Sequence, residues 1–313
     1  MQAEAGRELN SEQWRGVRDL ASELGFLETA AAPVSAVKNE AAVRDWVARG
    51  YHADMAWYAR GLDKRFDLNL VLAKAASVIV FTTPYHKEAC TLAGRKLARY
   101  ACGDDYHDVL KKKLWTLIEL MKTQVPQAQF RPYVDTGPIL ERYWAREAGL
   151  GWIGKNGNLI SRTAGSYLFL ACIVTDMTVP YGVPHAPFCG ECRACIDSCP
   201  TDAIPSAGTV DANKCISYLN IEHRGPFENA PGFAGWIFGC DICQEVCPWV
   251  RKFSREELMP ELQPRAACAA LSADELAEMD QQAFSTTFSK SAIKRTKMAG
   301  LKRNLSHLLE HGE

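Results

Sequence analysis

The stretch CGECRACIDSCP (residues 189–200) and the later stretch CDICQEVCP (residues 240–248) decide how the rest of this chain is interpreted. The chain has 12 cysteines, and eight of them fall between residues 188 and 248. The first stretch has the spacing CxxCxxCxxxCP, whereas the second, CxxCxxxCP, lacks a leading cysteine. Cys215, which lies between the two stretches, is the obvious replacement. The eight cysteines therefore form two sets of four.

This spacing is typical of two cubic iron-sulfur clusters, in which three closely spaced thiolates bind one [4Fe-4S] cube and the fourth binds the other. One cluster is then predicted at Cys189, Cys192, Cys195 and Cys247, and the other at Cys199, Cys215, Cys240 and Cys243. A proline follows the last cysteine of each stretch and adds no N–H group there. A structural zinc site is the alternative, because CxxC pairs also bind tetrahedral zinc.

The composition describes an ordinary water-soluble protein of 313 residues, with 47% hydrophobic residues, 23% charged residues and a net charge of -1. The first ten residues are polar, and the apolar runs are too short to span a bilayer. We therefore expect a cytoplasmic protein without a membrane partner, in which thiols stay reduced. The four cysteines outside the two sets are expected to be buried or incidental: Cys90, Cys102, Cys172 and Cys268.

The hydrophobic pattern predicts an α+β protein with three parts. Residues 1–180 form a mixed α/β domain, residues 181–250 a ferredoxin-like domain with two clusters, and residues 251–313 a short helical segment. Helical periodicity is found at residues 12–25, 41–58, 109–122, 139–148 and 273–284. Short β-branched apolar runs predict buried strands at residues 77–82 and 167–175.

Asp135 stands out in the stretch RPYVDTGPILER (residues 131–142), between the end of a strand and the start of a helix. Proteins of the α/β class often place catalytic groups at such a junction. A helix N-cap is the alternative, since aspartate accepts backbone N–H bonds there. The following loop GWIGKNG (residues 151–157) lets the backbone approach a large ligand, but it matches no phosphate or dinucleotide fingerprint.

The end of the chain is basic, with Lys290, Lys294, Arg295, Lys297, Lys302 and Arg303 in a short stretch. This density is typical of a surface that contacts phosphates, where each contact releases counterions. A solvated helix face is the alternative.

Together these motifs resemble the epoxyqueuosine reductases, a family of cobalamin and iron-sulfur enzymes that complete queuosine in the anticodon loop of certain tRNAs. The matching stretches are the cysteine pattern with CIS (215–217), RYACGDDYHDVL (99–110), VDTGPILER (134–142), GWIGKN (151–156) and KRTKMAGLKRN (294–304). The resemblance runs from about residue 12 to the end. Many members continue into a helical-repeat tail where this chain stops, so we expect no tRNA contacts from such a tail.

The resemblance implies a cobalamin held between the N-terminal domain and the ferredoxin-like domain, and an external low-potential electron donor. It makes Asp135 the proton donor above the cobalt. The implied cobalamin neighbours are Arg65, Lys155, Asn156, Ser161, Ser217 and Asp241. The expected tRNA contacts are Lys294, Arg295, Lys302 and Arg303.

The implied reaction removes the epoxide oxygen from epoxyqueuosine in tRNA. Breaking the C–O bond leaves an alkoxide, so Asp135 would have to hold a proton near neutral pH through a pKa raised by burial. Two other functions are compatible with the motifs. One is a cobalamin and iron-sulfur reductase of a small molecule, similar to reductive dehalogenases, which would not need the basic end. The other is a ferredoxin-type electron carrier, which would not need the long N-terminal region.

Overall fold

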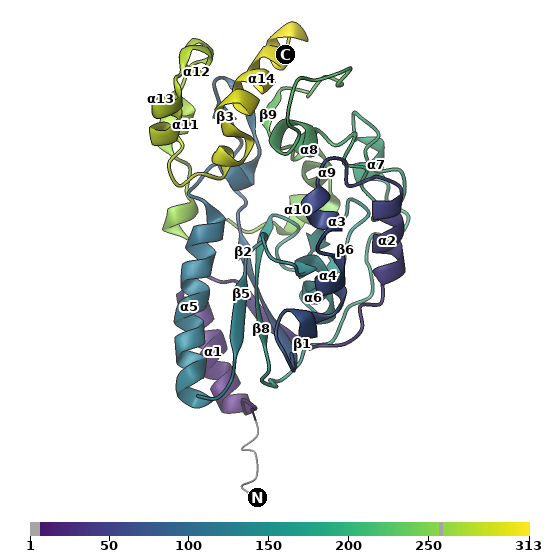
Figure 1. Cartoon of the computed structure of the whole chain (residues 1–313), viewed down its shortest axis with the longest axis vertical. Helices are drawn as coiled ribbons and strands as arrows, with labels where there is room; N and C mark the ends of the chain where they lie inside the picture. Colours follow the sequence, from purple (N-terminus) through teal and green to yellow (C-terminus); the bar gives the residue numbers. More distant parts are fainter. Residues whose placement is uncertain (1–6, 257–258) are drawn as a thin grey trace, which may run out of the picture.

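The computed structural model describes residues 7–256 and 259–313, and a four-stranded antiparallel sheet lies at its centre (Figure 1). The strand order is β1-β2-β8-β5, with bounds β1 Glu28–Pro33, β2 Ser77–Pro84, β5 Phe130–Tyr133 and β8 Leu168–Thr175. Every residue of β2 and β8 is buried. Both predicted strands are therefore confirmed, and they form the central pair of the sheet.

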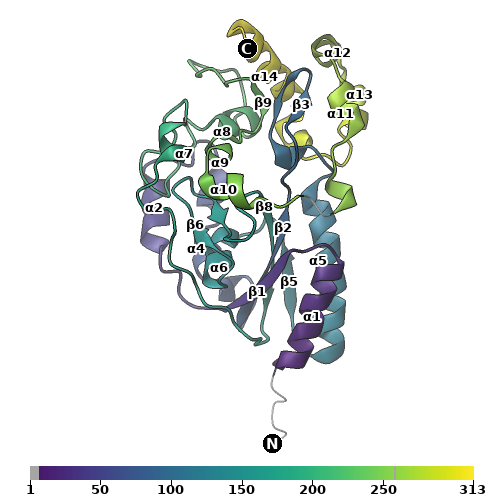
Figure 2. The ribbon, with the colours of Figure 1, turned by 180° about the vertical axis from the view of Figure 1, so that it is seen from behind.

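Helices cover both faces of this sheet: α1 (Ser11–Glu23), α5 (Tyr106–Gln124) and α6 (Glu141–Glu147). Alternate residues of a strand point to opposite faces. Ile79 and Phe81 therefore share one core with α1 and α5, whereas Val78 and Val80 share another with α6. Figure 2 shows α1 and α5 side by side on their face.

A second sheet lies at the opposite end of the molecule from the N-terminus, where the C-terminal helices gather (Figure 1). Its order is β3-β4-β9, with bounds β3 Cys90–Leu92, β4 Arg95–Leu97 and β9 Trp236–Phe238. It shares one hydrophobic core with residues of α8 Ile216–Ile221, α11 Ala266–Ala270, α12 Ala273–Glu278, α13 Gln281–Thr287 and α14 Lys297–Glu310. Strand β9, from between the two cysteine stretches, thus pairs with a strand of the N-terminal region. The predicted domain limits at residues 180 and 250 stay a prediction.

Short elements surround the cysteines and the glycine-rich loop. The helices are α7 Ala194–Asp197, α9 Ile242–Glu245 and α10 Pro248–Phe253, and the strands are β6 Trp152–Ile153 and β7 Leu159–Ile160. Helices α7 and α9 contact each other, which brings the two cysteine stretches together. In α10 the proline after the last cysteine occupies the first turn, where its missing N–H costs nothing.

Two predicted helices are divided in the structure. Residues 41–58 form α2 (Glu40–Ala48) and α3 (Ala56–Ala59), because Gly50 turns the chain with φ +70°. They are followed by α4 (Leu62–Phe66). Residues 273–284 are divided between α12 and α13, because the Asp280 side chain caps a new helix. Among the described residues, no helix has the length and apolar character needed to cross a bilayer.

Candidate active site and cluster ligands

The four cysteines of the first set line one cavity of about 220 Å³: Cys189, Cys192, Cys195 and Cys247. The indole Nε1 of Trp152 donates a hydrogen bond to Cys189 Sγ at 3.3 Å. Such N–H bonds to ligand sulfurs stabilise their negative charge and tune the potential of a bound cluster.

The second set, Cys199, Cys215, Cys240 and Cys243, also gathers in one place. Burial raises the pKa of the Cys240 thiol to about 12, and the charges of Cys215 and Cys199 act in the same direction. Burial, followed by the charges of Cys215 and Cys240, raises the pKa of Cys243 as well. The first set thus lines one cavity and the members of the second set act on one another, while the assignment of both sets as cluster ligands stays a prediction.

These cysteines differ from the ligands of a single metal ion. Within residues 7–256 and 259–313, no group of three or more His, Cys, Asp or Glu side chains is placed to hold one ion. In a [4Fe-4S] cube each sulfur ligand binds a different iron, so the four ligands enclose a volume, whereas zinc draws four ligands to one point. The four-cysteine cavity therefore fits a cube better than zinc.

Asp135 lies between β5 and α6, as the sequence predicts, but it does not cap the helix. Helix α6 starts after Leu140 without a side-chain cap. The backbone of Asp135 is left-handed, with φ +57°, and its N–H donates to Glu141 Oε1 at 2.7 Å. Its side chain is 62% exposed. The N-cap alternative is therefore wrong, and the carboxylate faces solvent.

Tyr106 and His107, the first residues of α5, hold this carboxylate. The Tyr106 hydroxyl donates to Asp135 Oδ2 at 2.9 Å, and His107 Nε2 lies 3.2 Å from the same oxygen. The other ring nitrogen, His107 Nδ1, lies 2.6 Å from Oδ1 of Asp105, which is the N-cap of α5. Tyr106 also stacks on Phe169 of the central sheet at 4.3 Å. Two carboxylates therefore bracket one imidazole, on a rigid helix start.

The charges in this site differ from the expectation for Asp135. Although the side chain is largely exposed, the protein around it displaces enough water to favour the neutral acid; the hydrogen bond and the charge of His107 outweigh this and lower the pKa of Asp135 below its usual value. Burial alone would lower the pKa of His107, but Asp105 and Asp135 raise it to about 9. The prediction of a raised pKa for Asp135 is therefore wrong for this arrangement. At neutral pH His107 carries the proton.

Glu141 and Gly137 fix the loop that carries Asp135. Burial, and then the charge of Asp135, raises the pKa of Glu141 to about 8, so this carboxyl is neutral at pH 7. It still accepts the Asp135 N–H bond. A Cβ atom on Gly137 would lie 2.1 Å from the Tyr133 ring, so only glycine fits without movement.

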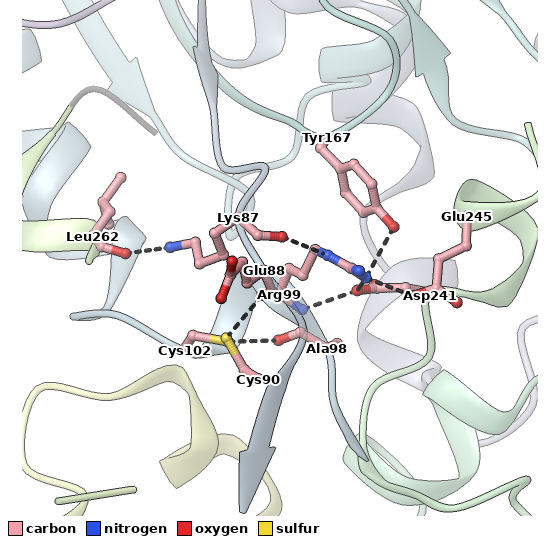
Figure 3. Close-up of a disulfide and its surroundings, with 10 residues drawn as sticks. All are labelled: Lys87, Glu88, Cys90, Ala98, Arg99, Cys102, Tyr167, Asp241, Glu245 and Leu262. Carbon is pink, nitrogen blue, oxygen red and sulfur yellow. Dashed lines mark hydrogen bonds and ion pairs between the residues drawn. A yellow bond between two sulfur atoms is a disulfide. The ribbon is translucent and has the colours of Figure 1, made fainter. Parts of the chain in front are cut away.

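Arg99 binds Asp241 and Glu245, two acidic residues that lie between Cys240 and Cys247 in the sequence (Figure 3). Its backbone N–H and its guanidinium both donate to Asp241 Oδ2, at 3.0 and 3.1 Å, and the guanidinium also binds Glu245 Oε1 at 2.6 Å. Asp241 directly follows Cys240 and is 2% exposed. Burial raises the pKa of Asp241 to about 6 against the opposing effect of Arg99. Asp241, a predicted cobalamin neighbour, is thus engaged by the protein itself.

Cys90 and Cys102 form a disulfide that closes the segment carrying Arg99 (Figure 3). The prediction that both are buried or incidental cysteines did not anticipate this bond. It forms because β3 and β4 make a hairpin that returns the chain toward Cys90, leaving the two Cα atoms 6.4 Å apart. This distance lies within the normal range for a disulfide.

Arg65 lies beneath the Asp135 loop and is buried, with its guanidinium 4.3 Å from the Tyr58 ring centre. It donates to the backbone carbonyls of Gly137 and Ile139 at 3.3 and 3.4 Å. Its Nε atom is buried without a hydrogen-bond partner among the described residues. An unpaired buried donor is costly, so this atom fits a ligand that brings an acceptor oxygen.

The other predicted cobalamin neighbours already have protein partners. Lys155 and Asn156 donate to backbone carbonyls of the cysteine-rich region, at 2.7 and 3.2 Å. Ser161 is buried and binds within its own turn. Ser217 lies in the first turn of α8, and its backbone N–H forms a hydrogen bond with the Cys215 side chain. These residues hold the glycine-rich loop and the cysteine-rich region in place.

The predicted tRNA contacts are of two kinds. Arg303 donates to three backbone carbonyls of residues 219–225, so it holds the fold. Arg295 binds Glu222 through two bonds of 2.7 Å. Lys294 is exposed and Lys302 half-buried, and neither forms an ion pair in the described part of the chain. The two lysines are therefore better placed for a phosphate than the two arginines.

The basic segment lies beside the acid site. The Asp105 N–H donates to the carbonyl of Lys290 at 2.7 Å. The hydrogen bond with Glu222 raises the pKa of Arg295, and the charge of Asp135 contributes to the same shift. Tyr106, His107 and Glu141 lie within the stretches that carry the family resemblance, but the sequence alone assigns them no role. The available signal was the run of polar and aromatic residues at 104–107, just before a strong helix.

Two family profiles match this chain. Residues 188–250 match the "4Fe-4S double cluster binding domain", and residues 65–136 match "Epoxyqueuosine reductase QueG, DUF1730". The epoxyqueuosine reductase of Synechocystis sp. is 45% identical over 282 residues, which cover 87% of this chain and 97% of the relative. That of Cellulophaga algicola is 40% identical over 289 residues, covering 91% and 94%.

Solved structures agree with these matches. A crystal structure of epoxyqueuosine reductase with a tRNA-Tyr epoxyqueuosine-modified stem loop gives a TM-score of 0.85 at 26% identity, covering 96% of this chain and 81% of that chain. The Streptococcus thermophilus epoxyqueuosine reductase gives 0.84 at 25% identity, with the same coverage. The mixed α/β fold and the double-cluster domain are thus shared with these proteins. Because its relatives at 40–45% identity align over most of both chains, this protein belongs to the epoxyqueuosine reductase family.

Proposed function

We propose that this protein is an oxidoreductase that reduces epoxyqueuosine to queuosine in the anticodon loop of tRNA. One observation carries the proposal. The solvent-facing carboxylate of Asp135 is held by Tyr106 and His107 beside the basic segment of residues 290–297. An acid that faces solvent next to exposed lysines suits a substrate group presented by a nucleic acid.

The reaction requires an acid at this place. Converting an epoxide to an alkene consumes two electrons and two protons, and the oxygen leaves as water. Each C–O bond that breaks puts negative charge on the oxygen. A positioned acid that protonates this oxygen typically raises the rate of such a step by about 100- to 10,000-fold. Asp135 is the group that would give the proton to the substrate oxygen.

Two [4Fe-4S] clusters would carry the electrons from an external low-potential donor. Cys189, Cys192, Cys195 and Cys247 would hold one, and Cys199, Cys215, Cys240 and Cys243 the other. Helices α7 and α9, which carry Cys195 and Cys243, contact each other, so the two sets are close to each other. This closeness supports electron transfer from one cluster to the other.

Cobalamin fits the residues around Asp135. When bound, it would supply a low-valent cobalt that can deliver electrons to the epoxide. The unpaired Nε of Arg65 would bind an acceptor oxygen of the cofactor, close to the loop that positions Asp135. The proposed neighbours Lys155, Asn156, Ser161, Ser217 and Asp241 would shape the surrounding wall through the protein contacts they already make.

The metal content of anaerobically reconstituted protein is the first test. About eight irons per chain, together with one tightly bound corrin, are expected. Full clusters without any corrin would contradict the proposal and leave a ferredoxin-type electron carrier. Next, an epoxyqueuosine-containing tRNA stem loop is supplied with a low-potential reductant and the product nucleoside is measured by mass spectrometry.

The variant Asp135→Asn tests the acid. We expect it to bind cobalamin normally and to lose about 100- to 10,000-fold in turnover. Asp108→Asn, an exposed residue on the same end of α5, is the control and should behave like the parent protein. Near-normal product in a single turnover of Asp135→Asn would remove Asp135 from the mechanism.

A further inference from the structure

The acid site needs more protons than Asp135 can hold. The proposed reaction consumes two, whereas one carboxyl group carries at most one. In the structure the pKa of Asp135 is lowered by His107, so the carboxylate starts without a proton. Asp135 must therefore receive protons during the reaction, and a protonated group within hydrogen-bond distance would supply them.

His107 is the group in the right place. Its Nε2 atom lies 3.2 Å from Asp135 Oδ2, and its Nδ1 atom lies 2.6 Å from Asp105 Oδ1. The side chain is 27% exposed, so water reaches the ring. An imidazole between a carboxylate on one side and solvent on the other can pass protons inward and take them up again.

The other titratable groups around the pair are less suited. Glu141 bonds the backbone N–H of Asp135 rather than its carboxylate. The Tyr106 hydroxyl does reach Asp135, but burial and the charge of Asp135 raise its pKa well above the usual value, so it stays neutral. The remaining groups that act on the site are the phenol of Tyr100, whose pKa burial raises well above its usual value, and the cationic guanidinium groups of Arg65, Arg142 and Arg295.

We propose that His107 is the proton store of this site, that Asp105 positions it, and that both protons of the reaction pass from His107 through Asp135 to the substrate oxygen. This inference rests on the proposed function and adds a positioning residue and a proton source to it.

Each of the two protons follows the same path. Asp135 gives its proton to the substrate oxygen as a C–O bond breaks, and the Nε2–H bond of His107 breaks as a proton moves to Asp135 Oδ2. Solvent then protonates the neutral imidazole again. Two passages supply the two protons, the external reductant supplies the two electrons, and the oxygen leaves as water.

The protonation of His107 can be measured directly by NMR titration of the histidine rings in oxidised, cofactor-loaded protein. The chain has 7 histidines, and the signal missing in His107→Gln identifies the ring. We expect its midpoint at about pH 9 in the parent protein and at a lower pH in Asp105→Asn. A midpoint near the ordinary value of 6.5, or one unaffected by Asp105→Asn, would overturn the inference.

Turnover as a function of pH is the second readout. Because His107 holds its proton below its pKa, product formation should fall as the pH rises through about 9. The fall should move to lower pH in Asp105→Asn. His107→Gln should lose about 100-fold in kcat at neutral pH, with unchanged cluster content and unchanged KM for the tRNA. A structural role alone would not shift the pH profile of Asp105→Asn, so an unshifted profile also contradicts the inference.

The two readouts separate this inference from the proposed function. If no variant and no parent protein reduces epoxyqueuosine, the proposed function fails, whereas the titration still decides whether His107 is held protonated. If the parent protein is active but His107→Gln keeps full kcat, only the inference fails.

Discussion

The cysteine-rich region and the acid site of this molecule hold their functional side chains in different ways. Three cysteines of the first set, Cys189, Cys192 and Cys195, lie close together in the sequence, and Cys247 lines the same cavity. The acid site is instead assembled from segments 28 and 29 residues apart, since Asp135, after β5, contacts Tyr106 and His107 at the start of α5. The cysteine pattern is therefore visible in the sequence, whereas the acid site depends on where a loop lies.

Loss of a single cluster ligand should have the largest effect. We expect Cys243→Ser to reduce the iron content from about eight to about four per chain and to abolish turnover, because a cube needs four ligands. Iron and sulfide analysis, together with electron paramagnetic resonance of the reduced protein, measures this.

The control is Cys268→Ala, which removes a buried cysteine outside both sets and should keep both clusters. Full iron content in Cys243→Ser would remove this cysteine from the ligands of the second cluster.

A change of loop position should affect only the acid site. In Gly137→Ala the new Cβ atom would meet the Tyr133 ring at 2.1 Å, so the loop carrying Asp135 must move. A misplacement of about 1 Å can cost about 100-fold in rate, and we expect a loss of that order in kcat. The iron content should stay normal.

Gly16→Ala is the matched control, because nothing lies within 4 Å of a Cβ atom at that position in α1. Full kcat in Gly137→Ala would show that the acid site does not depend on the position of the loop that carries Asp135.

The cysteine sets could be predicted from the sequence because Cys189, Cys192 and Cys195 have a recognisable local spacing, and their assignment as cluster ligands stays a prediction. Asp135 could be found because it lies in a recognisable stretch. The roles of His107 and Glu141 could not, because they arise from contacts between separate segments. The same holds for the pKa of Asp135, which depends on a neighbouring charge that burial arguments do not include.

The fold shows the same division. The two buried strands were predicted because their β-branched composition is local, whereas the order β1-β2-β8-β5 depends on pairing across the whole chain. The helix predicted at residues 41–58 was too long, because its periodicity continues through the turn at Gly50. The disulfide between Cys90 and Cys102 likewise depends on a hairpin that periodicity does not reveal.

Loss of two lysines from the basic C-terminal end, Lys294 and Lys302, should have a smaller effect on function. Replacing both Lys294 and Lys302 by alanine should weaken binding of the tRNA stem loop and reduce the slope of log K against log salt by about 0.7 to 0.9 per lysine. Fluorescence anisotropy over a range of KCl concentrations measures both quantities.

The double variant Lys38→Ala/Lys122→Ala is the matched control, since these two lysines lie in ion pairs with Glu147 and Glu119. An unchanged slope for Lys294→Ala/Lys302→Ala would exclude the two lysines as phosphate contacts.

The last change, Glu141→Gln, should affect stability rather than turnover or tRNA binding, because it keeps an acceptor for the Asp135 N–H but cannot ionise. The pKa of Glu141 is raised from its ordinary value of 4.5 to about 8 in the folded protein, so the unfolded chain releases this proton first. The parent protein therefore loses stability as the pH rises from about 4.5 to about 8. The variant avoids this loss, so its melting temperature relative to the parent should rise over that interval and stay constant above it.

Thermal melts at pH 5, 7 and 9 measure the difference, with the exposed Glu278→Gln as a control that shows no such trend. A difference that is independent of pH would mean that Glu141 is ionised in the folded protein, and that the loop is held by a charge rather than by a neutral carboxyl group.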